Sequence, residues 1–301
     1  MVSVAFFPIL GFEFIDLDVP GQVINNPDIR AITCHNLKHI FTSRSISSYY
    51  PIRTLTYAID HAIWGLEPGG FKLTNALIHL VNVYLVFWLI LRLSRRDHPT
   101  DSSPRARGEV AVATFAAGIF AVHPVVVEPV AWVSGREEVL MTLGALGCLH
   151  AHLAARRLQS EGAPWTRVLA WHLCAAVFCA TACMSNAVGA VIPLLIVAWD
   201  VIVLPRPRLW KTLGGTSLLW LIGSATIVVK KAGESVDTRE LEGGFTGEWV
   251  AIVMRTYWLN LKTIFRPAEL AIAYEWITPK SFAELDVILG GVALVATCAV
   301  L

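Results

Sequence analysis

Charged residues are scarce in this chain. Asp, Glu, Lys and Arg make up 16% of its 301 residues, whereas 55% of the residues are hydrophobic. A soluble domain carries about 25% charged residues. This shortage excludes an ordinary soluble globular protein and favours a chain that crosses a membrane several times. The formal net charge of +1 also lacks the basic excess that nucleic-acid binding requires.

Cysteines at useful spacings are lacking as well. The six cysteines are scattered, and most of them lie in apolar runs. Their positions match neither a metal site nor a disulfide framework. We therefore expect them to be small core residues, and we predict that the protein needs no metal.

The start of the sequence is a poor fit to a signal peptide. The apolar run 2–14 has no basic stretch before it and no small-residue cleavage site after it. This run is shorter than the roughly 20 residues that a membrane span requires. At the other end, Leu301 lies inside an apolar run. We therefore expect a fragment of a larger membrane domain, shortened at both ends.

Long apolar runs are abundant. They predict spans at 71–93, 137–155, 166–184, 186–204, 213–229 and 282–301. The apolar run 110–122 leads into the stretch from His123 to Arg136. The segment 249–265 is apolar but carries Arg255 and Lys262, so it either spans the membrane or lies in the interface. The expected fold class is an all-α polytopic membrane protein.

One membrane domain should cover residues 1–301. Within it we expect a long first external loop, 15–70, followed by a transmembrane bundle, 71–301. Apolar residues at helical spacing predict interfacial helices inside the loop, near 37–41 and over 49–64.

The loops differ in their content of Lys and Arg. The segments 92–107, 156–167 and 205–211 are basic, and short basic loops stay on the cytoplasmic side of a membrane. The poorly basic segments 15–70 and 125–138 should therefore share the opposite, non-cytoplasmic side. Residues of the two segments could then form one site.

The stretch 121–140 carries ionisable residues at a predicted membrane boundary. His123, Glu128 and Arg136 lie between two apolar runs, and two prolines interrupt the chain there. Ionisable groups at this depth are costly, so they usually face a cavity or one another and serve function. We predict that the stretch forms one wall of a polar site; anchoring of helix ends is the alternative.

Two acids, Asp16 and Asp18, open the external loop. In an extended segment they point the same way, and they lie close to the membrane surface. This placement suits a general base. It equally suits a solvated loop.

The predicted span 71–93 has a polar face. Asn75, His79 and Asn82 follow one another at positions i, i+4 and i+7, and Lys72 lies near the start of the span. This face should look into the bundle and not at lipid. Hydrogen bonding between helices is the simplest role for it.

Three blocks of residues in the region 14–140 resemble the membrane domain of the transmembrane and tetratricopeptide-repeat O-mannosyltransferases and their bacterial relatives. The blocks are Phe14, Asp18 and Asn25-Asn26-Pro27; Tyr50-Pro51, Asp60, Trp64-Gly65, Pro68, Phe71, Asn75 and His79; and His123-Pro124, Glu128, Val130, Trp132, Arg136-Glu137 and Leu140. From 185 to 275 the resemblance is looser and rests on Ser185-Asn186, Pro193, Asp200, Pro267 and Tyr274.

The resemblance implies a membrane glycosyltransferase with the C-type (GT-C) helical bundle. Such an enzyme moves a sugar, mannose or a similar hexose, from a polyprenyl phosphate to a Ser or Thr hydroxyl of a protein. The donor is a lipid-linked substrate, so no cofactor is implied. The reaction takes place on the non-cytoplasmic side of an integral membrane protein, in the bacterial inner membrane or in the endoplasmic reticulum membrane of a eukaryote.

The resemblance also implies roles for residues. Asp18, with Asp16 beside it, is the expected catalytic base. The expected substrate-binding residues are Arg136 as the main phosphate-binding group, together with His123, Glu128, Lys72, His79, Arg53 and Tyr274. Glu128 could instead pair with Arg136 and hold it in place.

The sequence departs from the family pattern at three positions. Val19 stands where the family has its second acid, Lys72 stands where it tends to have a histidine, and Arg53 follows the Tyr-Pro step instead of preceding the proline. A second hypothesis is therefore a non-catalytic membrane module that anchors another domain or binds lipid phosphate. A secondary transporter is the third, but the chain shows no convincing internal repeat.

Overall fold

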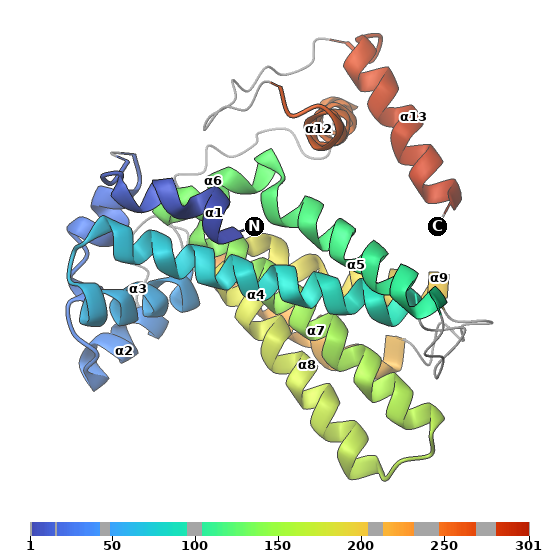
Figure 1. The fold of residues 1–301 in the computed structure, drawn as a ribbon, viewed down its shortest axis with the longest axis horizontal. Helices are drawn as coiled ribbons and strands as arrows, with labels where there is room; N and C mark the ends of the chain where they lie inside the picture. The colour runs from blue at the N-terminus through green and yellow to red at the C-terminus, as the bar shows by residue number, and fades with distance from the viewer. Residues whose placement is uncertain are drawn as a thin grey trace. The chain divides into compact units, whose positions relative to one another are not determined.

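The computed structural model describes residues 2–15, 17–42, 49–94, 104–203, 213–231, 247–268 and 281–300. Every regular element in these ranges is helical (Figure 1), which confirms the predicted all-α class. The chain forms two compact units, 1–234 and 235–301, and each is described by itself. The single domain over 1–301 stays a prediction.

The first unit contains most of the helices, and short helical turns (η) connect some of them. In chain order the elements are α1 (Val2–Phe6), η1 (Phe7–Gly11), η2 (Pro20–Ile24), η3 (Pro27–Ile29), α2 (Cys34–Thr42), α3 (Pro51–Trp64), α4 (Pro68–Ser94), α5 (Pro104–Val122), η4 (Pro124–Val126), α6 (Val127–Ala131), η5 (Val133–Gly135), α7 (Arg136–Ser160), α8 (Trp165–Ser185), η6 (Ala187–Val191), α9 (Ile192–Val203) and α11 (Ser217–Lys231). The second unit contains α12 (Gly247–Phe265) and α13 (Leu285–Val300).

Three helices are long and apolar enough to cross a membrane. They are Pro68–Ser94, Val133–Ser160 and Trp165–Ser185, and the segments Arg107–Val122 and Pro124–Ala131 make a fourth if this pair, bent by 49°, is one span. The spans expected at 71–93, 137–155 and 166–184 are thus confirmed as long apolar helices. The runs 186–204, 213–229 and 282–301 contain shorter apolar helices: Ala187–Ile202, Ser217–Val229 and Leu285–Thr297.

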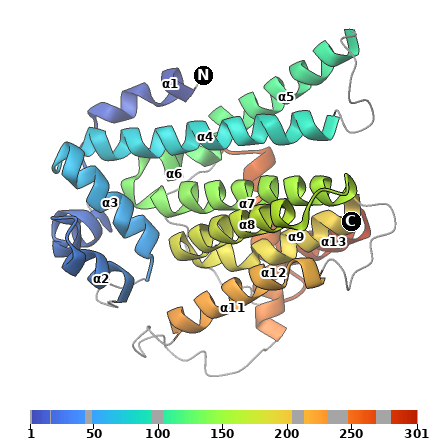
Figure 2. The same ribbon diagram turned by 90° about the horizontal axis from the view of Figure 1, so that it is seen from below.

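Helices α2 and α3 lie where helices were expected in the segment 15–70, and their interfacial position stays a prediction. Helix α3 begins with Pro51, whose fixed φ suits a first helical position, and Gly65 follows it at φ 65°. Pro68 then opens α4, so this span begins earlier than the expected Phe71. In Figures 1 and 2, α2 and α3 lie beside the N-terminal end of α4.

Helices α7 and α8 pack side by side as an antiparallel hairpin (Figure 1). The contact is close because α7 presents small residues: a Cβ at Gly144 would lie 2.7 Å from the Cβ of Ala182. Cys148 and Cys179 are buried in the same core, as expected of small core residues.

The two poorly basic segments that were predicted to share one side of the membrane contact each other. At one end of the bundle, the Tyr57 hydroxyl of the external loop donates to the Val133 carbonyl at 2.9 Å, so segments 15–70 and 125–138 meet. At the other end of α4, Arg92 contacts His150 of α7. The shared end of 15–70 and 125–138 is confirmed, while its non-cytoplasmic side stays a prediction.

Candidate functional site

Arg136, the first residue of α7, is the centre of a buried polar cluster. Its side chain has 0% exposed surface and forms an ion pair with the Asp60 carboxylate. Its Nε donates to Asn75 Oδ1 at 2.7 Å, and its Nη2 donates to the Phe71 carbonyl at 2.6 Å. The guanidinium carbon lies 4.7 Å from the ring centroid of Tyr57 and 5.7 Å from that of Phe71. The cluster therefore ties α3 and α4 to the start of α7.

This burial assigns Arg136 a structural task. A buried guanidinium needs a carboxylate and further hydrogen bonds to offset its desolvation, and here protein groups provide them. Glu128, the partner we expected, is exposed, and Asp60 takes that role instead. Contact between Arg136 and a donor phosphate requires a conformation that uncovers the guanidinium, so this contact stays a prediction.

The chain reaches Arg136 through a sharp local break. Trp132 has an extended backbone between α6 and η5, and Gly135 directly precedes α7. A Cβ at Gly135 would lie 2.6 Å from the Cα of Pro129. Glycine therefore allows the close approach that aims Arg136 at Asp60.

A second bridge lies next to this cluster. The Arg53 guanidinium donates to Glu137 Oε2 at 2.5 Å, and the Asn186 amide donates to Glu137 Oε1 at 3.3 Å. Arg53 is 5% exposed and lies 4.9 Å from the ring centroid of Tyr50. Arg53 thus links the external loop to α7 and to the turn after α8, and its predicted contact with a substrate stays untested.

Lys72 holds the start of the external loop. It is 2% exposed, and its ammonium donates to the Glu13 carbonyl at 2.9 Å and to the Phe12 carbonyl. Because these carbonyls lie just before Asp18 in the chain, Lys72 fixes the point from which the acid-bearing segment leaves the bundle. The structure shows Lys72 as a positioning residue.

The polar face of α4 looks into the bundle, as predicted. Asn75, His79 and Asn82 are each at most 2% exposed. Each bonds to a carbonyl of another helix or turn, which confirms the simplest role expected for them. The bonds are Asn75 Nδ2 to the Trp132 carbonyl at 3.0 Å, His79 Nε2 to the Ala121 carbonyl at 3.2 Å and Asn82 Nδ2 to the Val139 carbonyl at 2.9 Å.

Asp18 is exposed and lies at the same end of the bundle as Arg136. The next residue, Val19, is fully buried in one hydrophobic cluster with Tyr57 and Phe71, whose rings flank Arg136. The described contacts include none between the side chains of Asp18 and Arg136. The segment is also not extended as expected, because the Asp18 carbonyl accepts a helical hydrogen bond from the Gln22 N–H at 3.0 Å.

Three other predicted residues have different outcomes. His123 uses Nδ1 to accept a hydrogen bond from the Val125 N–H at 3.2 Å, so it caps the turn at the bend after α5. Asp16 and Tyr274 lie outside the described residues, and their predicted roles as second acid and binding residue stay predictions.

Sequence reasoning gave no role to Tyr57 or Asp60. A signal was present, because Arg53, Tyr57 and Asp60 recur at i, i+4 and i+7 on the buried face of α3. Burial raises the pKa of the Asp60 carboxyl, and the Arg136 guanidinium beside it opposes this rise. Burial also raises the pKa of Tyr57 to about 12, so its hydroxyl remains a donor at neutral pH.

A separate buried ion pair lies toward the other end of α7. Asp200 of α9 accepts from His152 Nε2 at 3.0 Å and from the Arg156 guanidinium at 2.7 Å. Asp200 and His152 are both 2% exposed. This cluster fastens α9 to α7. Its residues are separated along the chain from the Arg136 cluster by most of α7.

Comparison with curated proteins gives matches over about half of the chain. Human "Protein O-mannosyl-transferase TMTC4" is 32% identical over 48% of this chain and 21% of its own length. Drosophila melanogaster Tmtc3 is 32% identical over 40% of this chain and 14% of its own length. Mouse TMTC2 is 34% identical over 44% and 14%. No family profile matches, and no solved structure gives a significant match.

These matches confirm the resemblance found in the three sequence blocks. The matched proteins all carry the name protein O-mannosyl-transferase. The aligned part of this chain covers about a fifth of the length of the human relative. It covers a smaller share of the Drosophila and mouse relatives.

Proposed function

Because the chain is a relative of the transmembrane and tetratricopeptide-repeat O-mannosyltransferases, we propose that it contributes to a membrane glycosyltransferase that acts on proteins. The donor is mannose or a similar hexose on a polyprenyl phosphate, and the acceptor is a Ser or Thr hydroxyl on the non-cytoplasmic side. The observation that carries the proposal is the set of matches to proteins of that name, over a chain whose long apolar helices suit a membrane.

The architecture supports this proposal through the cap on the bundle. Residues 17–42 and 49–64 contain short helices. Buried Arg136 and Arg53 fasten α3 to α7, and buried Lys72 holds the chain just before residue 17. Asp18 stays exposed within this cap. A rigid polar cap at the end of apolar helices suits a substrate whose prenyl tail stays in lipid while its phosphate–sugar bond reaches the surface.

The chemistry is a displacement at the anomeric carbon. The acceptor oxygen forms a bond to that carbon as the bond to the phosphate oxygen breaks, and attack in one step inverts the configuration. The hydroxyl must lose a proton, and Asp18 is the carboxylate predicted to contact it. Cations stabilise the charge that develops on the leaving phosphate. We propose His123, at the exposed bend, as one of them.

Two observations favour a non-catalytic module as the second candidate. Val19, at the family's second acid position, is fully buried, and Arg136 is fully occupied by protein groups. Such a module would bind the lipid phosphate without transferring the sugar. Both candidates share the same donor headgroup.

One experiment separates the two candidates. Membranes that contain the chain are incubated with mannosyl-phosphoryl polyprenol and a Ser/Thr peptide, and the peptide mass is measured. Addition of a hexose mass, lost in Asp18→Asn while that variant still binds donor, supports the transferase. Binding of donor by the wild type without any peptide modification would establish the binding module instead.

A further inference from the structure

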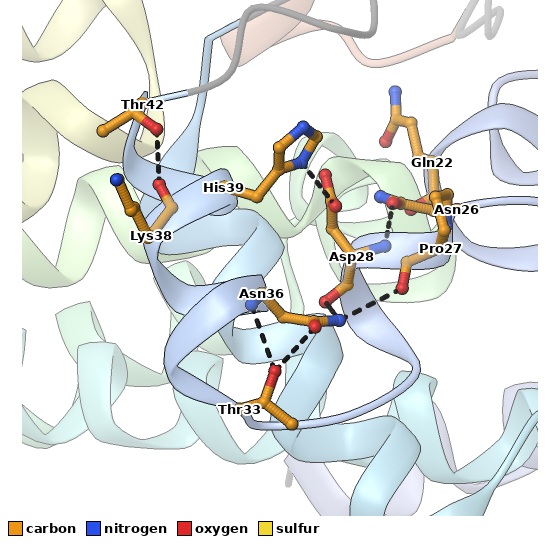
Figure 3. Close-up of polar contacts among 9 residues, drawn as sticks. All are labelled: Gln22, Asn26, Pro27, Asp28, Thr33, Asn36, Lys38, His39 and Thr42. Carbon is orange, nitrogen blue, oxygen red and sulfur yellow. Dashed lines mark hydrogen bonds and ion pairs between the residues drawn. The ribbon is translucent and has the colours of Figure 1, made fainter.

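An aspartate and a histidine form a dyad in the external loop. His39 Nδ1 lies 2.6 Å from Asp28 Oδ1 (Figure 3). The Asp28 side chain is 16% exposed, whereas that of His39 is 41% exposed. When Nδ1 carries the proton and donates it to the carboxylate, Nε2 is left as an acceptor. No partner of Nε2 lies among the described residues, and this atom is therefore available to a substrate proton.

The dyad is held by a network of its own. The Asp28 N–H donates to Asn26 Oδ1 at 2.9 Å, and the Asn36 amide donates to the carbonyls of Pro27 and Asp28 at 3.3 and 3.2 Å. Asn36 and His39 are i and i+3 on α2, so two residues on one face of this helix form hydrogen bonds to η3 (Figure 3). This arrangement preorganises the imidazole before any substrate arrives.

The dyad belongs to the same cap as Asp18. Ile40, which follows His39, and Val19, which follows Asp18, are buried in one hydrophobic cluster. The cluster also contains Ile29, which follows Asp28. Packing therefore fixes the backbone beside all three ionisable residues in a single rigid unit.

We propose that His39 accepts the proton of the acceptor hydroxyl, with Asp28 as its positioning residue. This inference rests on the proposed transferase function and deepens it. Asp18 retains the contact with the acceptor, while no side-chain partner among the described residues orients it as Asp28 orients His39. The dyad thereby takes the role of the family's second acid, at whose position this chain has Val19.

The step balances in atoms and electrons. The Ser or Thr oxygen forms a bond to the anomeric carbon, and the bond from that carbon to the phosphate oxygen breaks. The bonding electrons leave with the polyprenyl phosphate. The hydroxyl proton moves to His39 Nε2, the resulting imidazolium is stabilised by the Asp28 carboxylate, and the proton then passes to water.

Few ionisable groups besides the dyad surround His39. His35 stacks on it one turn earlier, with ring centroids 6.4 Å apart. Helix α3, which packs against α2, bears ionisable residues that have partners of their own. These are Arg53 with Glu137, Tyr57 with the Val133 carbonyl, Asp60 with Arg136, and His61 with Arg30. Asp28 is thus the acid that contacts His39 among the described residues.

The test uses His39→Asn in the complete chain. The Asn amide can donate to Asp28 in place of Nδ1, so the tie between α2 and η3 is kept while the Nε2 acceptor is lost. We expect the rate of hexose transfer to fall about 100-fold. Donor binding should stay within twofold of the wild-type value, because His39 contacts the acceptor and not the donor.

Asp28→Asn and His35→Gln complete the set. Asp28→Asn should slow transfer at least tenfold because it removes the carboxylate that orients and stabilises the imidazolium. His35→Gln, the matched histidine on the same helix, should stay within twofold of the wild type. If His39→Asn fails to accumulate, His39→Gln takes its place, and its transfer rate and donor binding are measured.

Three outcomes would overturn the assignment. Transfer by His39→Asn within twofold of the wild-type rate excludes His39 as the acceptor. Equal losses of donor binding and transfer in either His39 variant exclude it as well, because they indicate a structural role. Both results leave the transferase function standing, because the wild type is active. A wild type that transfers no hexose would instead refute the proposed function itself, and the role of His39 with it.

Discussion

The sharpest test of the fold concerns the buried guanidinium of Arg136. Arg136→Met keeps an unbranched side chain but removes the ion pair to Asp60 and the bonds to Asn75 and Phe71. The Asp60 carboxylate then remains 2% exposed, with the Thr74 hydroxyl at 2.7 Å as its remaining described hydrogen bond. Removal of one partner from a buried ion pair costs about 3–5 kcal/mol. We expect a loss of unfolding free energy in this range.

The same helix provides the control. Arg157 has a 77% exposed side chain and pairs with Glu161 one turn away. Exposed pairs of this kind contribute little to stability. Arg157→Met should therefore be nearly neutral. Both variants are compared by SDS-induced unfolding in mixed micelles, together with Asp60→Asn and the double variant Asp60→Asn/Arg136→Met.

The double variant measures the interaction energy between Asp60 and Arg136. Since it removes both charges, it should be more stable than the sum of the single losses predicts, by at least about 1 kcal/mol. An Arg136→Met protein within 1 kcal/mol of Arg157→Met would refute the structural role. If that variant kept its stability and lost donor binding, Arg136 would be the phosphate contact that the sequence predicts.

Two further predictions concern the same cluster. Tyr57 should lower stability at alkaline pH. Its pKa is about 12 in the folded chain, against an ordinary value of 10.0, so the unfolded chain loses the hydroxyl proton first. The free energy of unfolding should therefore fall by up to about 2–3 kcal/mol between pH 10 and 12. Tyr57→Phe should remove this part of the loss, and identical alkaline slopes in the two proteins would contradict the burial of the hydroxyl. Gly135→Ala should destabilise the chain by about 1–3 kcal/mol, since its Cβ would lie 2.6 Å from the Cα of Pro129. The control Gly162→Ala, at φ 69° with open space around it, should cost about 1 kcal/mol. Equal losses of stability in the two variants would contradict the close approach of Gly135 to Pro129.

The sequence predicted the parts of the fold that follow from periodicity. The face of Asn75, His79 and Asn82 on α4 is buried because a span can hide amides and an imidazole only by turning them toward neighbouring helices. The helix over Pro51–Trp64 likewise follows from its proline start and the spacing of its apolar residues. Local rules are sufficient for both.

The partners of the charged residues were not predictable in the same way. Arg136 pairs with Asp60 and Arg53 with Glu137 across separations of 76 and 84 residues. A one-dimensional pattern carries no information on which acid meets which arginine. Glu128 was a reasonable partner by proximity in sequence, but the break before α7 turns Arg136 toward α3.

The boundary at Pro68 shows another limit. Pro68-Gly-Gly reads as a chain break, yet α4 begins at Pro68, because proline suits a first helical turn. A Cβ at Gly70 would lie 2.3 Å from the Trp64 ring, so the glycine allows α3 and α4 to meet closely. The same residues serve as a loop signal and as a packing requirement, and only the tertiary structure separates the two uses.

The departure at Val19 has a consequence for the chemistry. Its side chain is fully buried beside Val23, Tyr57 and Phe71, so an acid introduced there would place a carboxylate in an apolar cluster. Such a group is costly to ionise and would carry a raised pKa. In a Val19→Asp variant, burial therefore leaves less of the carboxyl ionised at neutral pH than in a solvated acid, and the buried acid destabilises the cap that holds Asp18. Under the proposed function, the proton acceptor must come from a residue that the cap leaves accessible. Exposed Asp18 and His39, with its 41% exposed side chain, both meet this condition.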